Sequence, residues 1–151
     1  SFFLVLSNNI KLIHARSYTP TLISYLLKQT IGIPFIFDMR GFWADEKVEG
    51  LIWKKNSVIY KITKFFESKF ILNADKIISL TNAGVKEIKK FNYLKDKNIN
   101  VSVISTCANL KVFKPKINVN KFIINKHTSL KIGYVGSVRL WYRFEKVIIF
   151  F

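Results

Sequence analysis

The sequence predicts an α/β fold built on a doubly wound parallel sheet. Five short runs rich in β-branched and aromatic residues have the length of strands, and segments with helical periodicity separate them. The runs do not alternate cleanly between polar and apolar residues, which is typical of parallel strands covered on both faces. Strands that alternate with helices of this length indicate right-handed β-α-β crossovers. The runs are residues 11–17, 34–40, 76–81, 100–106 and 130–137.

The first predicted helix follows the strand at residues 11–17. Thr19 is a suitable N-cap, and Pro20 fits the first helical position because its missing N–H would have no partner there. Apolar residues recur at helical spacing from Leu22 to Leu27. Gly32 stands just past them, where a helix commonly ends.

Two further helices are predicted between the later strands. The longer one spans about residues 57–72, and the shorter one begins at Thr81 or Asn82. The residues expected to face the core are Ile59, Ile62, Phe66 and Phe70 in the longer helix, and Val85, Ile88 and Phe91 in the shorter. The residues expected to face solvent are Lys61, Lys64 and Lys69. A last amphipathic helix begins near residue 143 and runs to the final residue without a cap, so we expect a fold that is incomplete at both ends.

Composition limits the class of protein. With 151 residues, of which 50% are hydrophobic, the chain can bury the core of one ordinary domain. Its apolar runs fall short of the roughly 18 residues that a membrane-spanning helix needs. The single Cys107 cannot form an internal disulfide, which fits a reducing compartment, and one Cys with two separated His residues excludes a zinc site. We therefore expect a cytoplasmic protein.

The net charge of +16 admits two interpretations. It fits an anionic partner, such as nucleic acid, nucleotide or phospholipid, and it also fits a general bias in residue usage. The bias in residue usage explains most of the positive charge, because the excess is Lys rather than Arg and is spread along the chain. A nucleic-acid module more often clusters its basic residues beside aromatic ones, so no nucleic acid is expected. The charge can still hold the protein at an anionic membrane surface, at the inner face of the membrane.

Candidate ligand-binding residues stand at the end of the first predicted strand. In an open α/β sheet, ligands bind beyond the carboxyl ends of the strands. This strand ends in His14, Arg16 and Ser17, directly before a helix N-terminus whose free N–H groups favour an anion or a sugar hydroxyl. Taken alone, His14 is more readily explained as a satisfied histidine near a strand end.

The second predicted strand runs into the sequence DMRGFWADE, expected to form a loop. Its candidate residues are Asp38, Arg40, Gly41, Asp45 and Glu46. Charged groups beside aromatic rings suit a carbohydrate, because rings stack on sugar faces while carboxylate and guanidinium groups bind hydroxyls. The alternative is an ion-paired loop, in which Arg40 binds Asp38 or Glu46 and Trp43 packs into the domain.

A third candidate is the turn in the sequence GYVGS, after the last predicted strand. Gly136 and Ser137 would let the backbone approach a phosphate at the start of a helix. They lack a full dinucleotide-binding glycine motif and a P-loop lysine, and a glycine at such a turn is usually structural. No nucleophile stands with an evident base, so no catalytic residue is assigned.

The order of these landmarks resembles the family 4 retaining glycosyltransferases of GT-B fold. The segments that carry the resemblance span essentially the whole chain and are IHARSY, GIPFIFDMRGFWADEKVEG, KFFESKFILNADKIISLT, VISTCANLKVFKP and LKIGYVGS. The resemblance implies two Rossmann-like domains that face each other across a cleft. It places His14 and Arg16 at the cleft, the candidates of DMRGFWADE on the acceptor side, and Gly136 and Ser137 at the donor phosphate.

On this resemblance the chain has three parts. Residues 1–113 would belong to the acceptor-side domain, 114–128 would form a polar linker, and 129–151 would begin the nucleotide-sugar-binding domain. We expect a longer natural protein, of which this fragment would be inactive alone.

The expected activity is transfer of a sugar, with retention, from a nucleotide-sugar to a glycan or lipid-linked acceptor, as in cell-surface polysaccharide synthesis. The resemblance implies no metal and no other cofactor. Two other interpretations stay open. One is a non-catalytic basic α/β module that binds nucleic acid or an anionic membrane surface, and the other is the inactive product of a split gene.

Overall fold

The computed structural model describes residues 2–95, 97–114, 133–136 and 144–150. The chain divides into two units, Ser1–Ser105 and Thr106–Phe151. The predicted linker at 114–128 lies outside the described residues except for Lys114, so the predicted domain boundaries stay a prediction.

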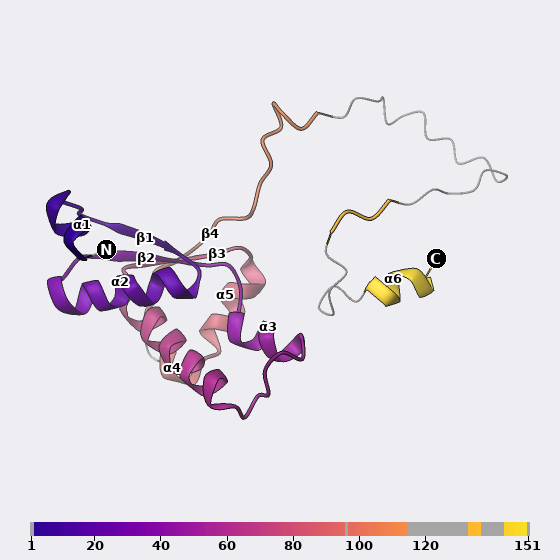
Figure 1. The fold of residues 1–151 in the computed structure, drawn as a ribbon, viewed down its shortest axis with the longest axis horizontal. Coiled ribbons are helices and arrows are strands. Elements are labelled where there is room, and N and C mark those ends of the chain that lie inside the picture. The colour runs from indigo at the N-terminus through magenta and orange to yellow at the C-terminus, as the bar shows by residue number, and fades with distance from the viewer. Residues whose placement is uncertain (1, 96, 115–132, 137–143, 151) are drawn as a thin grey trace. The chain divides into compact units, whose positions relative to one another are not determined.

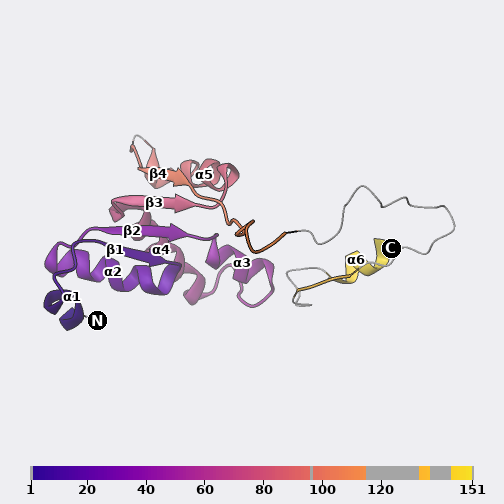
Figure 2. The same ribbon diagram turned by 90° about the horizontal axis from the view of Figure 1, so that it is seen from above.

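The first unit is an α/β fold around a four-stranded, all-parallel sheet with the strand order β1-β2-β3-β4 (Figure 2). The strands are β1 (Ile13–Arg16), β2 (Phe35–Met39), β3 (Lys76–Ser79) and β4 (Val101–Val103). The helices of this unit are α1 (Phe2–Ser7), α2 (Tyr18–Ile31), α3 (Trp43–Glu49), α4 (Val58–Asn73) and α5 (Asn82–Lys89), with a short 3-10 helix at Asn92–Leu94. Strands alternate with helices, which confirms the predicted Rossmann-like α/β class.

The helices that connect the strands lie on one face of the sheet. The strand order never reverses between β1 and β4, and right-handed crossovers then place each connecting helix on the same side. Figure 1 shows α2, α4 and α5 together on that side. Along β2, Phe35, Phe37 and Met39 are buried, whereas Ile36 and Asp38 are only half-buried. The sequence suggests cover on both faces, but in the described sheet only the helix side is fully packed.

Aromatic rings fill the space between the sheet and the helices. Phe37 of β2 lies edge-on to Phe70 of α4 and to Tyr18 of α2, with ring centroids 5.8 Å and 5.7 Å away. All three side chains are at most 5% exposed. Burial of this area, at about 25 cal/mol per Å², is the main force that holds the two helices on the sheet.

Helix α2 begins at Tyr18, so the predicted N-cap at Thr19 is wrong. The backbone carbonyl of Ser17 already accepts the N–H of Thr21, at 3.3 Å, and the side chain of Tyr18 is anchored in the core. Pro20 is therefore the third helical residue, where its N–H would still have no partner within the helix. The predicted end is confirmed, because Gly32 adopts φ 75° and donates to the Lys28 carbonyl at 3.0 Å.

The starts of α4 and α5 confirm their prediction. The Ser57 hydroxyl accepts the N–H of Tyr60, at 3.4 Å, and the Thr81 hydroxyl accepts the N–H of Gly84, at 3.0 Å. The predicted inner face of α4 is partly wrong. Ile59 and Ile62 are 50% and 51% exposed.

The second unit contains α6 (Phe144–Phe150), which confirms the last predicted helix. Residues 133–136 form no strand, so the strand predicted at 130–137 is wrong for its described part. The rest of that segment lies outside the described residues. Within the described parts of the chain, no helix is long and apolar enough to cross a membrane.

Candidate functional site

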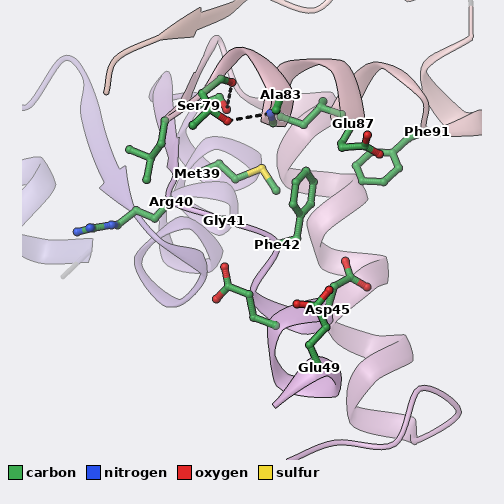
Figure 3. A pocket seen from close by; sticks show the side chains of 15 residues that line it. Met39, Arg40, Gly41, Phe42, Asp45, Glu49, Ser79, Ala83, Glu87 and Phe91 are labelled. Carbon is green, nitrogen blue, oxygen red and sulfur yellow. Dashed lines mark hydrogen bonds between the residues drawn. The ribbon is translucent and has the colours of Figure 1, made fainter. Parts of the chain in front are cut away.

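A pocket of about 500 Å³ opens at the carboxyl ends of β2 and β3 (Figure 3). The residues after β2, from Arg40 to Phe42, form one wall together with α3. Helix α5 forms the facing wall, together with the residues just before and after it. This is the edge at which an open α/β sheet binds its ligands.

Four of the nine acidic residues of the chain line this pocket, namely Asp45, Glu46, Glu49 and Glu87. They gather there although Lys and Arg outnumber Asp and Glu by 25 to 9 in the whole sequence. The lining also includes Ser79 and Thr81. The pocket therefore combines a largely apolar lining with two hydroxyl groups and with carboxylates, of which Asp45 and Glu87 also bind side chains of the protein.

Two aromatic rings complete the lining. Phe42 and Phe91 lie edge to face, with centroids 6.1 Å apart and planes at 86°. Both are half-buried, so each ring is held by the protein and still reaches the pocket. In Figure 3 the ring of Phe42 stands between Met39 and the carboxylates of α3. A ring beside carboxylates suits a ligand with both an apolar face and hydroxyl groups.

The segment predicted as a loop after β2 contains a helix. Trp43–Glu49 form α3, and the N–H of Glu46 binds the carbonyl of Phe42 at 2.9 Å. The first turn of α3 carries Asp45 and Glu46, whose charge is favourable near a helix N-terminus. The local run of two acids therefore favours the helix start that sequence reasoning missed.

Gly41 brings the chain close to the carboxylate of Glu46. A Cβ at Gly41 would lie 2.0 Å from Oε1 of Glu46, so any larger residue must displace that side chain. The Gly41 carbonyl also lies 3.3 Å from the Tyr18 hydroxyl, which ties the pocket wall to the core.

A buried polar network lies between α2, α3 and α4, and no local sequence pattern predicts it. Glu67 is fully buried, and its carboxylate accepts hydrogen bonds from the Tyr18 hydroxyl and from Lys64. Lys64 also binds Asp45 at 2.9 Å, and the Tyr60 hydroxyl donates to Asp45 at 2.7 Å. The network thus reaches the pocket wall through Asp45. Lys64 therefore points inward, and its predicted solvent-facing position is wrong.

Burial sets the protonation of this network. Loss of solvent, with smaller effects from Glu67, raises the pKa of Tyr18. Burial also raises the pKa of Glu67, against the opposing effect of its hydrogen bonds from Lys64 and Tyr18. The pKa of Lys64 is raised, because its bonds to Glu67 and Asp45 outweigh the desolvation that lowers it.

Seven of the ten predicted site residues fall into two groups. Arg40, Gly41, Asp45 and Glu46 line the pocket, although Figure 3 shows the Arg40 side chain directed away from Asp45 and Glu87. The second group consists of His14, Arg16 and Asp38 and does not line the pocket.

In the second group, the Asp38 carboxylate lies 3.3 Å from Nε2 of His14 and 3.9 Å from Nε of Arg16. Arg16 and Asp38 are also register partners on β1 and β2. The alternative pairing of Asp38 with Arg40 is therefore wrong, whereas Trp43 does pack inward, 5.6 Å from the ring of Tyr18.

Ser17 is placed between β1 and α2 in a strained backbone conformation. Its φ of 70° and ψ of −179° fall in a region that is nearly restricted to glycine and costs about 1–3 kcal/mol for other residues. Its N–H donates to the Asp38 carbonyl at 3.0 Å, which helps to hold this geometry. Strain of this kind is concentrated at functional sites, although its presence alone defines no ligand.

Replacing Ser17 with Gly is expected to raise the free energy of unfolding by about 1 kcal/mol. Relief of strain of about 1–3 kcal/mol exceeds the cost of about 0.5–1 kcal/mol from the greater freedom of glycine in the unfolded chain. Urea unfolding measures this change. Ser17→Ala is the control, because it removes the hydroxyl but keeps the Cβ. Equal stability of the two variants would contradict the strain argument.

The predicted donor turn lies in the second unit. Gly136 is exposed in the second unit, and Ser137 lies outside the described residues, so the donor-binding prediction is not tested. Among the described residues, no group of three or more His, Cys, Asp and Glu side chains is arranged to hold a metal ion.

The fold and the pocket define a Rossmann-like α/β protein with a ligand-sized cavity at the carboxyl edge of its sheet. No protein-family model, no curated protein and no solved structure matches this chain.

Proposed function

We propose that this chain is the acceptor-side part of a retaining glycosyltransferase, and that a sugar of the acceptor binds in the pocket of β2, β3, α3 and α5. The pocket lining carries this proposal, because carboxylates accept hydrogen bonds from sugar hydroxyls and Phe42 and Phe91 offer apolar rings. A volume of about 500 Å³ also falls in the ordinary range for small-ligand sites.

The pocket is a better site for the sugar than the group of His14, Arg16 and Asp38. His14 and Arg16 expose 56% and 61% of their side chains, and Asp38 is occupied by both of them. A ligand there would keep most of its contact with water, whereas the pocket removes water from two sides. We assign the His14 group to the positioning of the β1 and β2 ends.

The nucleotide-sugar donor is proposed to bind the second unit at Gly136 and Ser137. In this proposal, backbone N–H groups at the turn neutralise charge on the departing diphosphate, without a required metal. The whole reaction is proposed to take place at the cytoplasmic side of the membrane, with a glycan or lipid-linked acceptor.

Saturation-transfer NMR with glucose, galactose and N-acetylglucosamine tests sugar binding by the full chain. The double variant Glu46→Gln and Glu49→Gln keeps the shape of both side chains, which are exposed, and circular dichroism checks that it is folded. Hydrogen bonds to a charged group contribute about 1.5–3 kcal/mol, so we expect at least a tenfold loss of affinity.

Arg16→Gln is the matched control, because Arg16 is also exposed and charged but lies outside the pocket. It should leave sugar binding unchanged. The absence of a sugar signal with the unaltered chain contradicts the proposed function. Binding that survives the double variant but is lost in Arg16→Gln would place the sugar at the His14 group instead.

A further inference from the structure

Exposed apolar side chains form a row along α4. Val58, Ile62 and Phe65 stand at helical spacing, and they are 72%, 51% and 55% exposed. The loop that leads into α4 adds Leu51 and Ile52, at 80% and 54%. A helix at a protein surface normally shows polar residues to water. Single exposed apolar residues are ordinary, but several that share one helix face indicate an interaction surface. We call these five residues the α4 face.

A groove connects the α4 face to α2. It has a volume of about 200 Å³ and is lined by residues of α2, α3 and α4, among them Leu22, Ile62 and Phe66. Its lining is mostly apolar. The polar groups in the lining are the hydroxyls of Thr19, Thr63 and the buried Tyr18. Apolar surface therefore extends from the α4 face toward the neighbouring helix.

Lysines outnumber acidic residues around the α4 face, although Glu49 is exposed just before Leu51 and Asp45 binds Lys64 of α4. Helix α2 contains no acidic residue, and the only acid of α4, Glu67, is fully buried. Neither helix therefore exposes a carboxylate. The lysines in the loop and on α4 beside the row are Lys54, Lys55, Lys61 and Lys69. The pocket, by contrast, gathers acidic residues on α3 and α5. The basic charge of the chain thus adjoins its exposed apolar row.

We propose that the α4 face docks the protein on an anionic lipid bilayer, as a surface that lies on the membrane without crossing it. Apolar side chains on one helix face enter the boundary between headgroups and acyl chains. Lysines beside them bind the anionic headgroups, and each contributes about a fivefold gain in binding. The combination fits an anionic lipid surface, because α2 and α4 supply an apolar row with lysines beside it and expose no carboxylate of their own. This docking is independent of sugar binding in the pocket.

Vesicle co-sedimentation of the full chain tests this docking. We expect binding to vesicles of phosphatidylcholine mixed with phosphatidylglycerol, weak binding to phosphatidylcholine alone, and loss of binding as salt rises. The double variant Val58→Ser and Ile62→Ser should lower partitioning by about tenfold or more, because both side chains leave the interface. The control Val103→Ser and Ile104→Ser changes the same residue types at 39% and 57% exposure on β4 and the residue after it, and it should bind like the unaltered chain.

A second pair of variants isolates the charge. Lys54→Gln with Lys61→Gln should lower binding about tenfold or more, whereas Lys86→Gln with Lys89→Gln on α5 should change it little. Circular dichroism establishes that each variant is folded. Three results would overturn the proposal: equal binding to neutral and anionic vesicles, full binding by the Val58 and Ile62 variant, or a lipid-independent dimer that this variant dissociates. Binding to RNA in place of vesicles, lost with the Lys54 and Lys61 variant, would also overturn it.

Discussion

Replacing Glu67 with Ala is expected to lower the free energy of unfolding by about 3–5 kcal/mol, which is a large share of the about 5–15 kcal/mol of an ordinary domain. Glu67 is fully buried and holds both the Tyr18 hydroxyl and the Lys64 ammonium group. The substitution leaves those two groups without this partner inside the protein. Removing one member of a buried ion pair is more damaging than replacing the whole pair, because the remaining charge stays desolvated.

Glu87→Ala is the control for Glu67→Ala. Glu87 also binds a lysine three residues away, Lys90, but its side chain is 55% exposed. An exposed pair contributes about 0–1 kcal/mol, so this variant should unfold nearly like the unaltered chain. Urea denaturation followed by circular dichroism gives both values. If the two variants lose the same stability, burial is not what makes the Glu67 network important.

The pH dependence of Glu67→Gln gives a second readout. Burial raises the pKa of Glu67 above its usual value of 4.5, so the folded state favours the protonated carboxyl. Between the pKa of Glu67 in the unfolded state and its higher pKa in the folded state, the unfolded chain binds fewer protons than the folded one. The contribution of Glu67 to the free energy of unfolding therefore falls as the pH rises through the folded pKa. Gln cannot titrate, so the variant should lack this slope. A slope that is unchanged in the variant would contradict the assignment to Glu67.

The sequence predicted the elements better than the side-chain directions within them. Runs of β-branched and aromatic residues located the cores of β1 to β4, and the caps of α4 and α5 confirmed their predicted starts. These signals are local, because a cap acts within one turn of its helix. The start of α2 was missed because Tyr18 is fixed by distant residues such as Phe37 and Phe70, which no local pattern reveals.

Helix α4 shows why periodicity assigned some residues to the wrong face. Its pattern placed Ile62 inside and Lys64 outside, yet Ile62 is half-exposed and Lys64 binds the buried Glu67. A buried acid needs a partner inside the protein, and Lys64, three residues before Glu67, provides it. The face of α4 that points to the core therefore includes this pair and differs from the face that the apolar residues alone would define. The one available signal was Glu67 itself, the only acid within α4.

The candidate site was predictable in part, because strand ends meet at one edge of a parallel sheet. The segment after β2 did supply one wall of a pocket. The facing wall comes from the end of β3, from α5 and from the residues that flank this helix. Its residues Ser79, Thr81, Glu87 and Phe91 were not predicted as site residues, because they lie about 40 residues away in the sequence. His14 and Arg16 stand on β1 at the edge of the sheet, whereas the pocket lies at the ends of β2 and β3, and the sequence did not reveal this strand order.

Replacing Phe70 with Ala is expected to destabilise the protein by about 3–5 kcal/mol, the usual loss for a large buried aromatic residue. Phe70 is 2% exposed, and its ring lies within 6.3 Å of the rings of Tyr18, Tyr25 and Phe37. Ala would leave a cavity where α2, α4 and β2 meet, and the loss of packing adds to the loss of buried area.

A second phenylalanine on α4, Phe65, provides a matched control for Phe70→Ala. Phe65 stands on the same helix but is 55% exposed, and Phe65→Ala should change the free energy of unfolding by no more than about 0.5 kcal/mol. Urea unfolding of both variants separates core packing from helix propensity, because Ala favours a helix equally at either position. A large loss in Phe65→Ala would mean that the α4 face is packed against protein, and it would count against both this core assignment and the docking of that face on lipid. A loss confined to Phe70→Ala places the core between α4 and the sheet and leaves the α4 face free for the membrane.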